Sequence, residues 1–166
     1  TPLVRINAGG PLVLATDGGP DWEDNTTSTG DSYTVSSGSP YSSTEVFYEN
    51  RDASIPSYID ASTYYDVMHI QRSISDPAYP MIFSIAVPNG DYIVNLYFAI
   101  RYNGTSNPGE RVFSVNIEDE RLLDDFDISA EFGHRQAGLV QNNITVTDGV
   151  LEIRFFENIE NPLING

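Results

Sequence analysis

The sequence contains no cysteine and no lysine, so all eight of its basic residues are arginine. The absence of cysteine excludes disulfide scaffolds, thiolate zinc sites and cysteine nucleophiles. Long apolar runs are also missing: none approaches the roughly 20 residues of a membrane span, so membrane insertion is not expected. A chain of 166 residues can bury one sizeable core without a metal or a disulfide, which predicts a single domain.

Negative charge dominates the composition. The 24 Asp and Glu residues give the chain a net charge of −16 at pH 7. Such a surface repels phosphate backbones and anionic lipid, so nucleic acid is not expected as a partner. It suits a neutral ligand, a cation such as Ca²⁺ or a salty extracellular setting, although solubility alone explains it equally well.

Alternation of apolar and polar residues, rather than helical periodicity, characterises the chain. In residues 92–100 the even-numbered positions are apolar, and in 111–117 the odd-numbered positions Phe113, Val115 and Ile117 are apolar. Both patterns predict half-buried strands. The apolar run 81–87 predicts another strand, and 4–7 a short one.

A hairpin is expected near the end of the chain. Ile144 and Val146 precede the turn residues Asp148-Gly149, and an alternating segment begins at Leu151. Several strands separated by Gly, Pro, Asn and Asp turns predict an antiparallel sandwich or barrel. The stretches 17–44 and 45–73 show no clean period, so we expect them to be long functional loops.

Signatures of catalysis are scarce. His69 and His134 lack the spacing of metal ligands, and the sequence has no Gly-x-Ser-x-Gly elbow and no phosphate loop. With so many acidic residues, pairs of carboxylates arise by chance and do not indicate glycoside hydrolysis. We therefore do not expect an enzyme. Asn25, Asn103 and Asn143 each begin an Asn-x-Thr glycosylation acceptor pattern, which is also frequent by chance.

A series of short motifs runs through nearly the whole chain in a fixed order. They are Ile6-Asn7-Ala8-Gly9-Gly10, the Trp-containing stretch 17–24, His69-Ile70-Gln71-Arg72, Pro88–Tyr92 with Leu96–Ala99, Gly109–Val115, Asp127-Ile128, Asp148–Leu151 and Asn161–Ile164. In this order they resemble the malectin-like carbohydrate-binding family, also known as carbohydrate-binding module family 57.

The resemblance implies a jelly-roll-like β-sandwich that binds sugar through aromatic and acidic residues on loops at one end. The chain departs from the family at three positions. Ile100 stands where Glu is frequent, and Asn103 and Ser73 stand where sugar-binding members carry aromatics. The sugar specificity of those members is therefore not carried over. The ends of the chain look like cuts from a longer polypeptide, so we expect residues 1–166 to be a module of a larger protein.

Candidate ligand-binding residues follow from what sugars require, which is a flat apolar face and well-placed polar groups. Tyr102 keeps the inward parity of its strand but lies at its end, beside Asn103, so it either stacks on a sugar or caps the core. Glu160 either accepts hydrogen bonds from vicinal hydroxyls or is a solvated acid. Arg72 either contacts two hydroxyls or stabilises the fold. Tyr48 and Tyr65 belong to a tyrosine-rich region that suits an adaptable binding platform.

Acidic loops raise the alternative of a calcium site. Asp17, Asp21 and Asp24 lie in a glycine-rich loop, and carboxylate oxygens suit Ca²⁺. A second acidic group lies in 119–127. Neither has the spacing of an EF-hand, and a solvated acidic face explains both.

The sequence thus predicts an extracellular, non-catalytic module that binds a neutral oligo- or polysaccharide and contacts neighbouring domains of its polypeptide. The alternative is a structural, assembly or adhesion domain of a cell-surface or filament protein that kept the fold without sugar binding.

Overall fold

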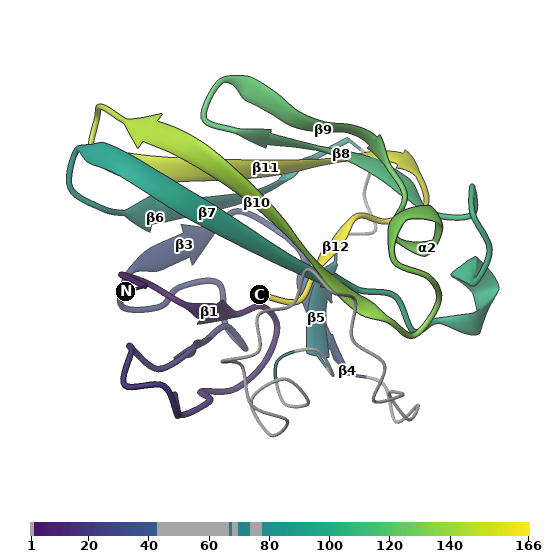
Figure 1. Ribbon diagram of the computed structural model, residues 1–166, viewed down its shortest axis with the longest axis horizontal. Coiled ribbons are helices and arrows are strands. Elements are labelled where there is room, and N and C mark those ends of the chain that lie inside the picture. The colour runs from purple at the N-terminus through teal and green to yellow at the C-terminus, as the bar shows by residue number, and fades with distance from the viewer. Residues whose placement is uncertain (1, 43–66, 68–69, 74–77) are drawn as a thin grey trace.

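The computed structural model describes residues 2–42, 67, 70–73 and 78–166. In this part of the chain a five-stranded antiparallel sheet forms one layer (Figure 1). Its strands, in spatial order, are β3 (Tyr33–Val35), β6 (Met81–Ala86), β11 (Val150–Ile159), β8 (Val112–Ile117) and β9 (Glu120–Phe126). Tyr48, Tyr65 and His69 lie outside the described residues.

The second layer is built on the long strands β7 (Gly90–Ala99) and β10 (Ala137–Val146), which pair antiparallel over ten residues. The C-terminal segment joins the other edge of β7, because Tyr97 N–H donates to the carbonyl of Gly166 at 2.9 Å and Asn165 N–H donates to that of Tyr97 at 3.0 Å. Figure 1 shows the β7–β10 pair crossing the five-stranded sheet.

Smaller elements surround the two layers. They are a sheet of β4 (Ser39–Ser42), β5 (Ile70–Ser73) and β12 (Leu163–Ile164), a parallel pair of β1 (Ile6–Asn7) and β2 (Glu23–Asp24), the 3-10 turn η1 (Asn103–Thr105) and the helix α2 (Ile128–Glu131). Among the residues described, no helix has the length and apolar character needed to cross a membrane.

The core lies between the layers and follows the predicted alternation. The even-numbered residues Val94, Leu96 and Phe98 of β7 and the odd-numbered Phe113, Val115 and Ile117 of β8 are buried in one cluster. The Phe98 and Phe113 rings, one from each layer, have centroids 5.8 Å apart. Burial of each such side chain contributes about 1.5–3 kcal/mol. The predicted all-β sandwich is confirmed.

The outer face of β7 carries a second, smaller core at its C-terminal half. Trp22 of the first loop packs edge-on against Tyr97, with ring centroids 5.5 Å apart, and Ala99 lies in the same cluster. Tyr97 and Ala99 are therefore buried although they have the outward parity of the strand. The alternation predicted one buried face of this strand, whereas the folded loop buries part of its second face as well.

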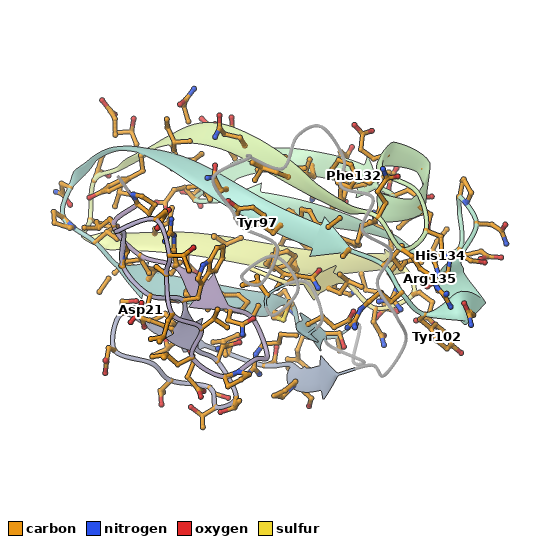
Figure 2. All side chains as sticks on the ribbon, turned by 60° about the horizontal axis from the view of Figure 1, so that its bottom comes forward. Asp21, Tyr97, Tyr102, Phe132, His134 and Arg135 are labelled. Carbon is orange, nitrogen blue, oxygen red and sulfur yellow. The ribbon has the colours of Figure 1, made fainter. Side chains whose placement is uncertain are left out.

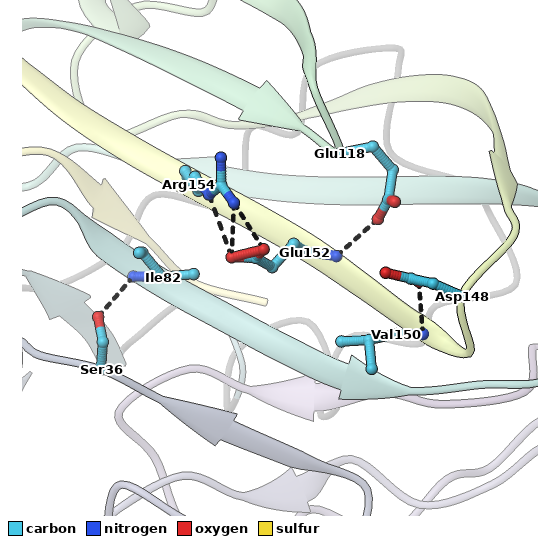
Figure 3. Close-up of polar contacts among 7 residues, drawn as sticks. All are labelled: Ser36, Ile82, Glu118, Asp148, Val150, Glu152 and Arg154. Carbon is cyan, nitrogen blue, oxygen red and sulfur yellow. Dashed lines mark hydrogen bonds and ion pairs between the residues drawn. The ribbon is translucent and has the colours of Figure 1, made fainter.

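The predicted hairpin at Asp148-Gly149 is wrong. β10 pairs with β7, whereas β11 pairs with β6 and β8, so the chain passes from one layer to the other between Val146 and Val150. Asp148 Oδ1 shapes the link by accepting from Val150 N–H at 3.1 Å (Figure 3). A hairpin and such a crossing bury the same alternating residues, so the pattern does not distinguish them.

The stretch 17–44 is also more regular than predicted, because its described residues hold β2, β3 and β4. Tyr33 and Val35 of β3 are buried in the main core, and the Tyr33 hydroxyl donates to the carbonyl of Asp24 at 2.5 Å. These strands have four residues or fewer, and β3 and β4 are flanked by Ser and Gly. Such short segments carry too few apolar residues to show a period.

Candidate functional site

Tyr102 lies just beyond the end of β7 and is 58 % exposed. Its carbonyl accepts from Thr105 N–H at 3.1 Å, which closes the η1 turn. The ring lies over Gly104: a Cβ at Gly104 would fall 2.4 Å from the nearest ring carbon. Glycine at this position therefore allows the ring to rest on the turn with the rest of its surface open to solvent.

Glu160 follows the end of β11 in a left-handed backbone conformation, with φ of 60°. Its carboxylate is about half exposed, and Oε2 accepts from Asn161 N–H at 3.1 Å. The side chain is held by its own turn and still offers oxygen to solvent.

Arg111 joins these elements and was not among the predicted site residues. It is 5 % exposed, Nη1 donates to the Asn161 carbonyl at 2.9 Å, and Nη2 lies 3.8 Å from Glu160 Oε2. Burial lowers the pKa of Arg111, while the nearby Glu160 and Tyr102 act in the opposite direction. The sequence did carry a signal: Arg111 shares the inward parity of Phe113, and a charge at a core position is unusual.

Asn103 lies beside Tyr102 but is held by another loop. Its Oδ1 accepts from Arg135 Nη2 at 3.1 Å, while Arg135 N–H donates to the carbonyl of Ile100 at 2.8 Å. The ring of His134 is hydrogen-bonded to the Arg101 carbonyl at 3.2 Å. Figure 2 shows Tyr102, His134 and Arg135 at one end of the molecule and Asp21 toward the other.

Arg72 is 1 % exposed, and its donors reach the protein interior. Nε donates to Asn25 Oδ1 at 2.6 Å and Nη1 to the carbonyl of Gly38 at 2.6 Å. Nη2 donates to the carbonyls of Asn25 at 2.5 Å and Thr27 at 2.9 Å. Burial lowers the pKa of Arg72. These contacts support the structural alternative, in which Arg72 fastens the first loop to β5.

The acidic residues of the first loop hold the loop itself. Asp17 forms a two-pronged ion pair with Arg5, at 2.9 and 2.5 Å, and the hydrogen bond from Arg5 holds the pKa of Asp17 well below its usual range. Asp21 Oδ1 accepts from Ala15 N–H at 2.8 Å, and Asp24 Oδ1 from Thr26 N–H at 2.8 Å.

No group of three or more His, Cys, Asp or Glu residues that could hold a metal is found among the residues described. Calcium binding by the first loop therefore stays a prediction to which the described donors add no support. Tyr48 and Tyr65 stay predictions as well.

The malectin domain family model matches residues 3–166, and the chain belongs to this family. The family is carbohydrate-binding in general and non-catalytic. No curated protein matched the chain.

Solved structures share the fold at low sequence identity. A chain of the plant complex of the peptide RALF23 with FER and LLG2 matches with a TM-score of 0.82 and 18 % identity, covering 99 % of this chain and 47 % of that one. The ANXUR1 extracellular domain from Arabidopsis thaliana matches with a TM-score of 0.76 and 16 % identity, covering 99 % of this chain and 46 % of that one. A Bacteroides uniformis β-glucuronidase matches with a TM-score of 0.71 and 16 % identity, covering 98 % of this chain and 17 % of that one. The chain thus spans less than half of the plant chains and about a sixth of the glucuronidase.

Proposed function

We propose that this domain binds a neutral oligosaccharide, without catalysis, at the end of the sandwich formed by Tyr102, Glu160 and Asn161. The observation that carries the proposal is the exposed Tyr102 ring seated on Gly104, together with the buried Arg111, which lies 3.8 Å from the half-exposed Glu160 carboxylate and donates to the carbonyl of Asn161. A flat ring stacks on the C–H face of a sugar, and a carboxylate accepts hydrogen bonds from its hydroxyls.

Charge supports a neutral ligand. A protein with a net charge of −16 repels anionic polymers over much of its surface, whereas an uncharged glycan loses nothing by approaching it. An extracellular setting is part of the proposal, in keeping with the extracellular receptor domains that share the fold. Neighbouring domains of the same polypeptide are proposed as further partners.

The test is a neutral-glycan array followed by isothermal titration of the strongest oligosaccharide. Tyr102→Ala and Glu160→Gln are each expected to weaken binding by about tenfold or more, since 1.4 kcal/mol of lost interaction is tenfold. Tyr102→Phe keeps the stacking face and is expected to bind nearly normally. Glu120→Gln is the matched acidic control, because Glu120 is exposed and lies at the opposite end of β8 from Arg111. Normal binding by a Tyr102→Ala, Glu160→Gln double variant would refute this site.

A structural or assembly role is the second candidate. It is motivated by Ser73 and Asn103, which replace aromatics of sugar-binding relatives, and by the Asn103 side chain being hydrogen-bonded to Arg135. An array without any bound glycan, together with self-association in sedimentation experiments, would favour this role over sugar binding.

A further inference from the structure

Arg111 is a buried charge whose position costs folding free energy. Two of its nitrogens face Asn161 and Glu160, but its buried Nε has no hydrogen-bond partner among the described residues. The guanidinium has five N–H donors, and burying it without full pairing is costly. Replacing such a buried ion with an apolar residue of similar volume is often neutral or stabilising. A reason other than stability is therefore needed for this arginine.

The turn that Arg111 holds is strained. Glu160 has φ of 60°, a conformation that costs a residue with a side chain roughly 1–2 kcal/mol. Asn161 is held on both sides of the turn: its N–H donates to Glu160 Oε2 and its carbonyl accepts from Arg111. Strained residues persist where the surrounding contacts over-determine them, and they gather at binding sites.

The backbone of Arg111 is anchored by strand pairing in the five-stranded sheet. Arg111 immediately precedes β8, and the next residue, Val112, pairs with Ile159 at the end of β11. The two ends of the clamp, Arg111 and Glu160, are thus attached to adjacent strands of the five-stranded sheet. A side chain fixed in this way holds the rim of a site with little freedom.

We propose that Arg111 is the positioning residue of the candidate sugar site: it clamps the strained Glu160–Asn161 turn so that the Glu160 carboxylate is presented at the end of the sandwich that carries the exposed Tyr102 ring. The inference rests on the proposed function for its purpose, but the clamp itself is tested without any ligand.

The ligand-free test is amide hydrogen exchange by NMR on wild type, Arg111→Met and Arg111→Lys. In Arg111→Met we expect the Asn161 amide to exchange at least tenfold faster, while the amides of the β11 ladder, such as that of Ile153, keep their protection. Arg111→Lys is expected to restore part of the Asn161 protection. Arg121→Met is the matched control, since Arg121 is exposed, pairs with Asp124 three residues away and lies over the Phe156 ring, without contact to the Glu160–Asn161 turn among the interactions of the described residues. Unchanged exchange at Asn161 in Arg111→Met would overturn the proposal.

The ligand test is a double-mutant cycle with the neutral oligosaccharide that binds wild type most tightly. Arg111→Met is expected to weaken binding at least tenfold in the wild-type background and less than twofold in Glu160→Gln, because Arg111 acts through Glu160. Equal losses in both backgrounds would overturn the proposal. If wild type binds no sugar while the Asn161 amide still loses protection in Arg111→Met, the clamp stands and the proposed function fails. If Arg111→Met does not fold, Arg111→Lys carries both tests, with losses in the same direction.

Discussion

The guanidinium of Arg111, 5 % exposed, lies 3.8 Å from the half-exposed carboxylate of Glu160 and donates to the carbonyl of the next residue, Asn161. Arg111 and Glu160, 49 positions apart in the chain, are thereby joined at one end of the sandwich.

Arg72 is expected to be a structural residue. Arg72→Met removes the donor that the carbonyls of Asn25 and Gly38 receive from Arg72 and leaves that of Thr27 with the Asn25 side-chain amide at 3.3 Å. Each buried group left unpaired costs about 1–3 kcal/mol. We expect urea denaturation to show a loss of about 3 kcal/mol or more. Arg121→Met, which removes an exposed ion pair and an exposed contact with the Phe156 ring, is expected to change stability by no more than about 1 kcal/mol. An Arg72→Met variant as stable as wild type would contradict this role.

Gly9 and Gly18 allow the cost of a side-chain clash to be measured apart from the cost of a left-handed backbone conformation. Both have positive φ, 81° and 75°, but a Cβ at Gly9 would fall 2.3 Å from the carbonyl oxygen of Gln71, whereas a Cβ at Gly18 meets nothing. Gly18→Ala is expected to cost about 1–2 kcal/mol from the left-handed conformation alone. Gly9→Ala is expected to cost clearly more in the same thermal or urea measurement. Equal costs would show that the approach of β5 does not constrain Gly9.

The Arg5–Asp17 pair predicts a pH dependence of stability. The folded pKa of Asp17 is lowered below its unfolded value of about 3.9, so the contribution is fully present above that pH and is lost as pH falls through the lower folded pKa. Asp17→Asn is expected to be about 1 kcal/mol less stable than wild type at pH 7, with the difference shrinking below pH 4.

Glu120→Gln is the control for this pair. Removing an exposed negative charge from a protein of net charge −16 relieves repulsion, so this variant is expected to be as stable as wild type or slightly more stable at pH 7. A difference between Asp17→Asn and wild type that stays constant from pH 7 to pH 2 would argue against the pair.

The three glycosylation acceptor asparagines are expected to differ in whether the folded protein can carry a glycan there. Asn25 is fully buried, and its Oδ1 accepts from Gly9 N–H and Arg72 Nε, so it has no room for a glycan. Asn103 and Asn143 are exposed. After secretion from a glycosylating cell, mass spectrometry with and without glycosidase is expected to find folded protein unmodified at Asn25. A glycan at Asn25 in folded protein would contradict the described network.

Much of the candidate site was accessible from the sequence. Tyr102 was predicted from its parity at the end of a strand and Glu160 from the family motif; the structure leaves the Tyr102 ring exposed and places the Glu160 carboxylate 3.8 Å from Arg111. Their roles in binding stay predictions. Arg111 was missed as a site residue, because alternation identifies an inward position without telling which groups surround a charge placed there. Arg72 was left with two alternatives, since only the fold shows that Asn25, Thr27 and Gly38 reach it.

The sequence by itself determined the strands of the core and their inward residues, because the period of a strand depends only on its own residues. Val94, Phe98, Phe113 and Ile117 are all buried as their parity predicts. Tertiary structure alone decided which strands pair: β10 and β11, three residues apart, lie in different layers. It also placed Arg111 beside Glu160. Both results depend on contacts between distant segments, whose free energy is a property of the packed assembly and is not encoded in any local pattern.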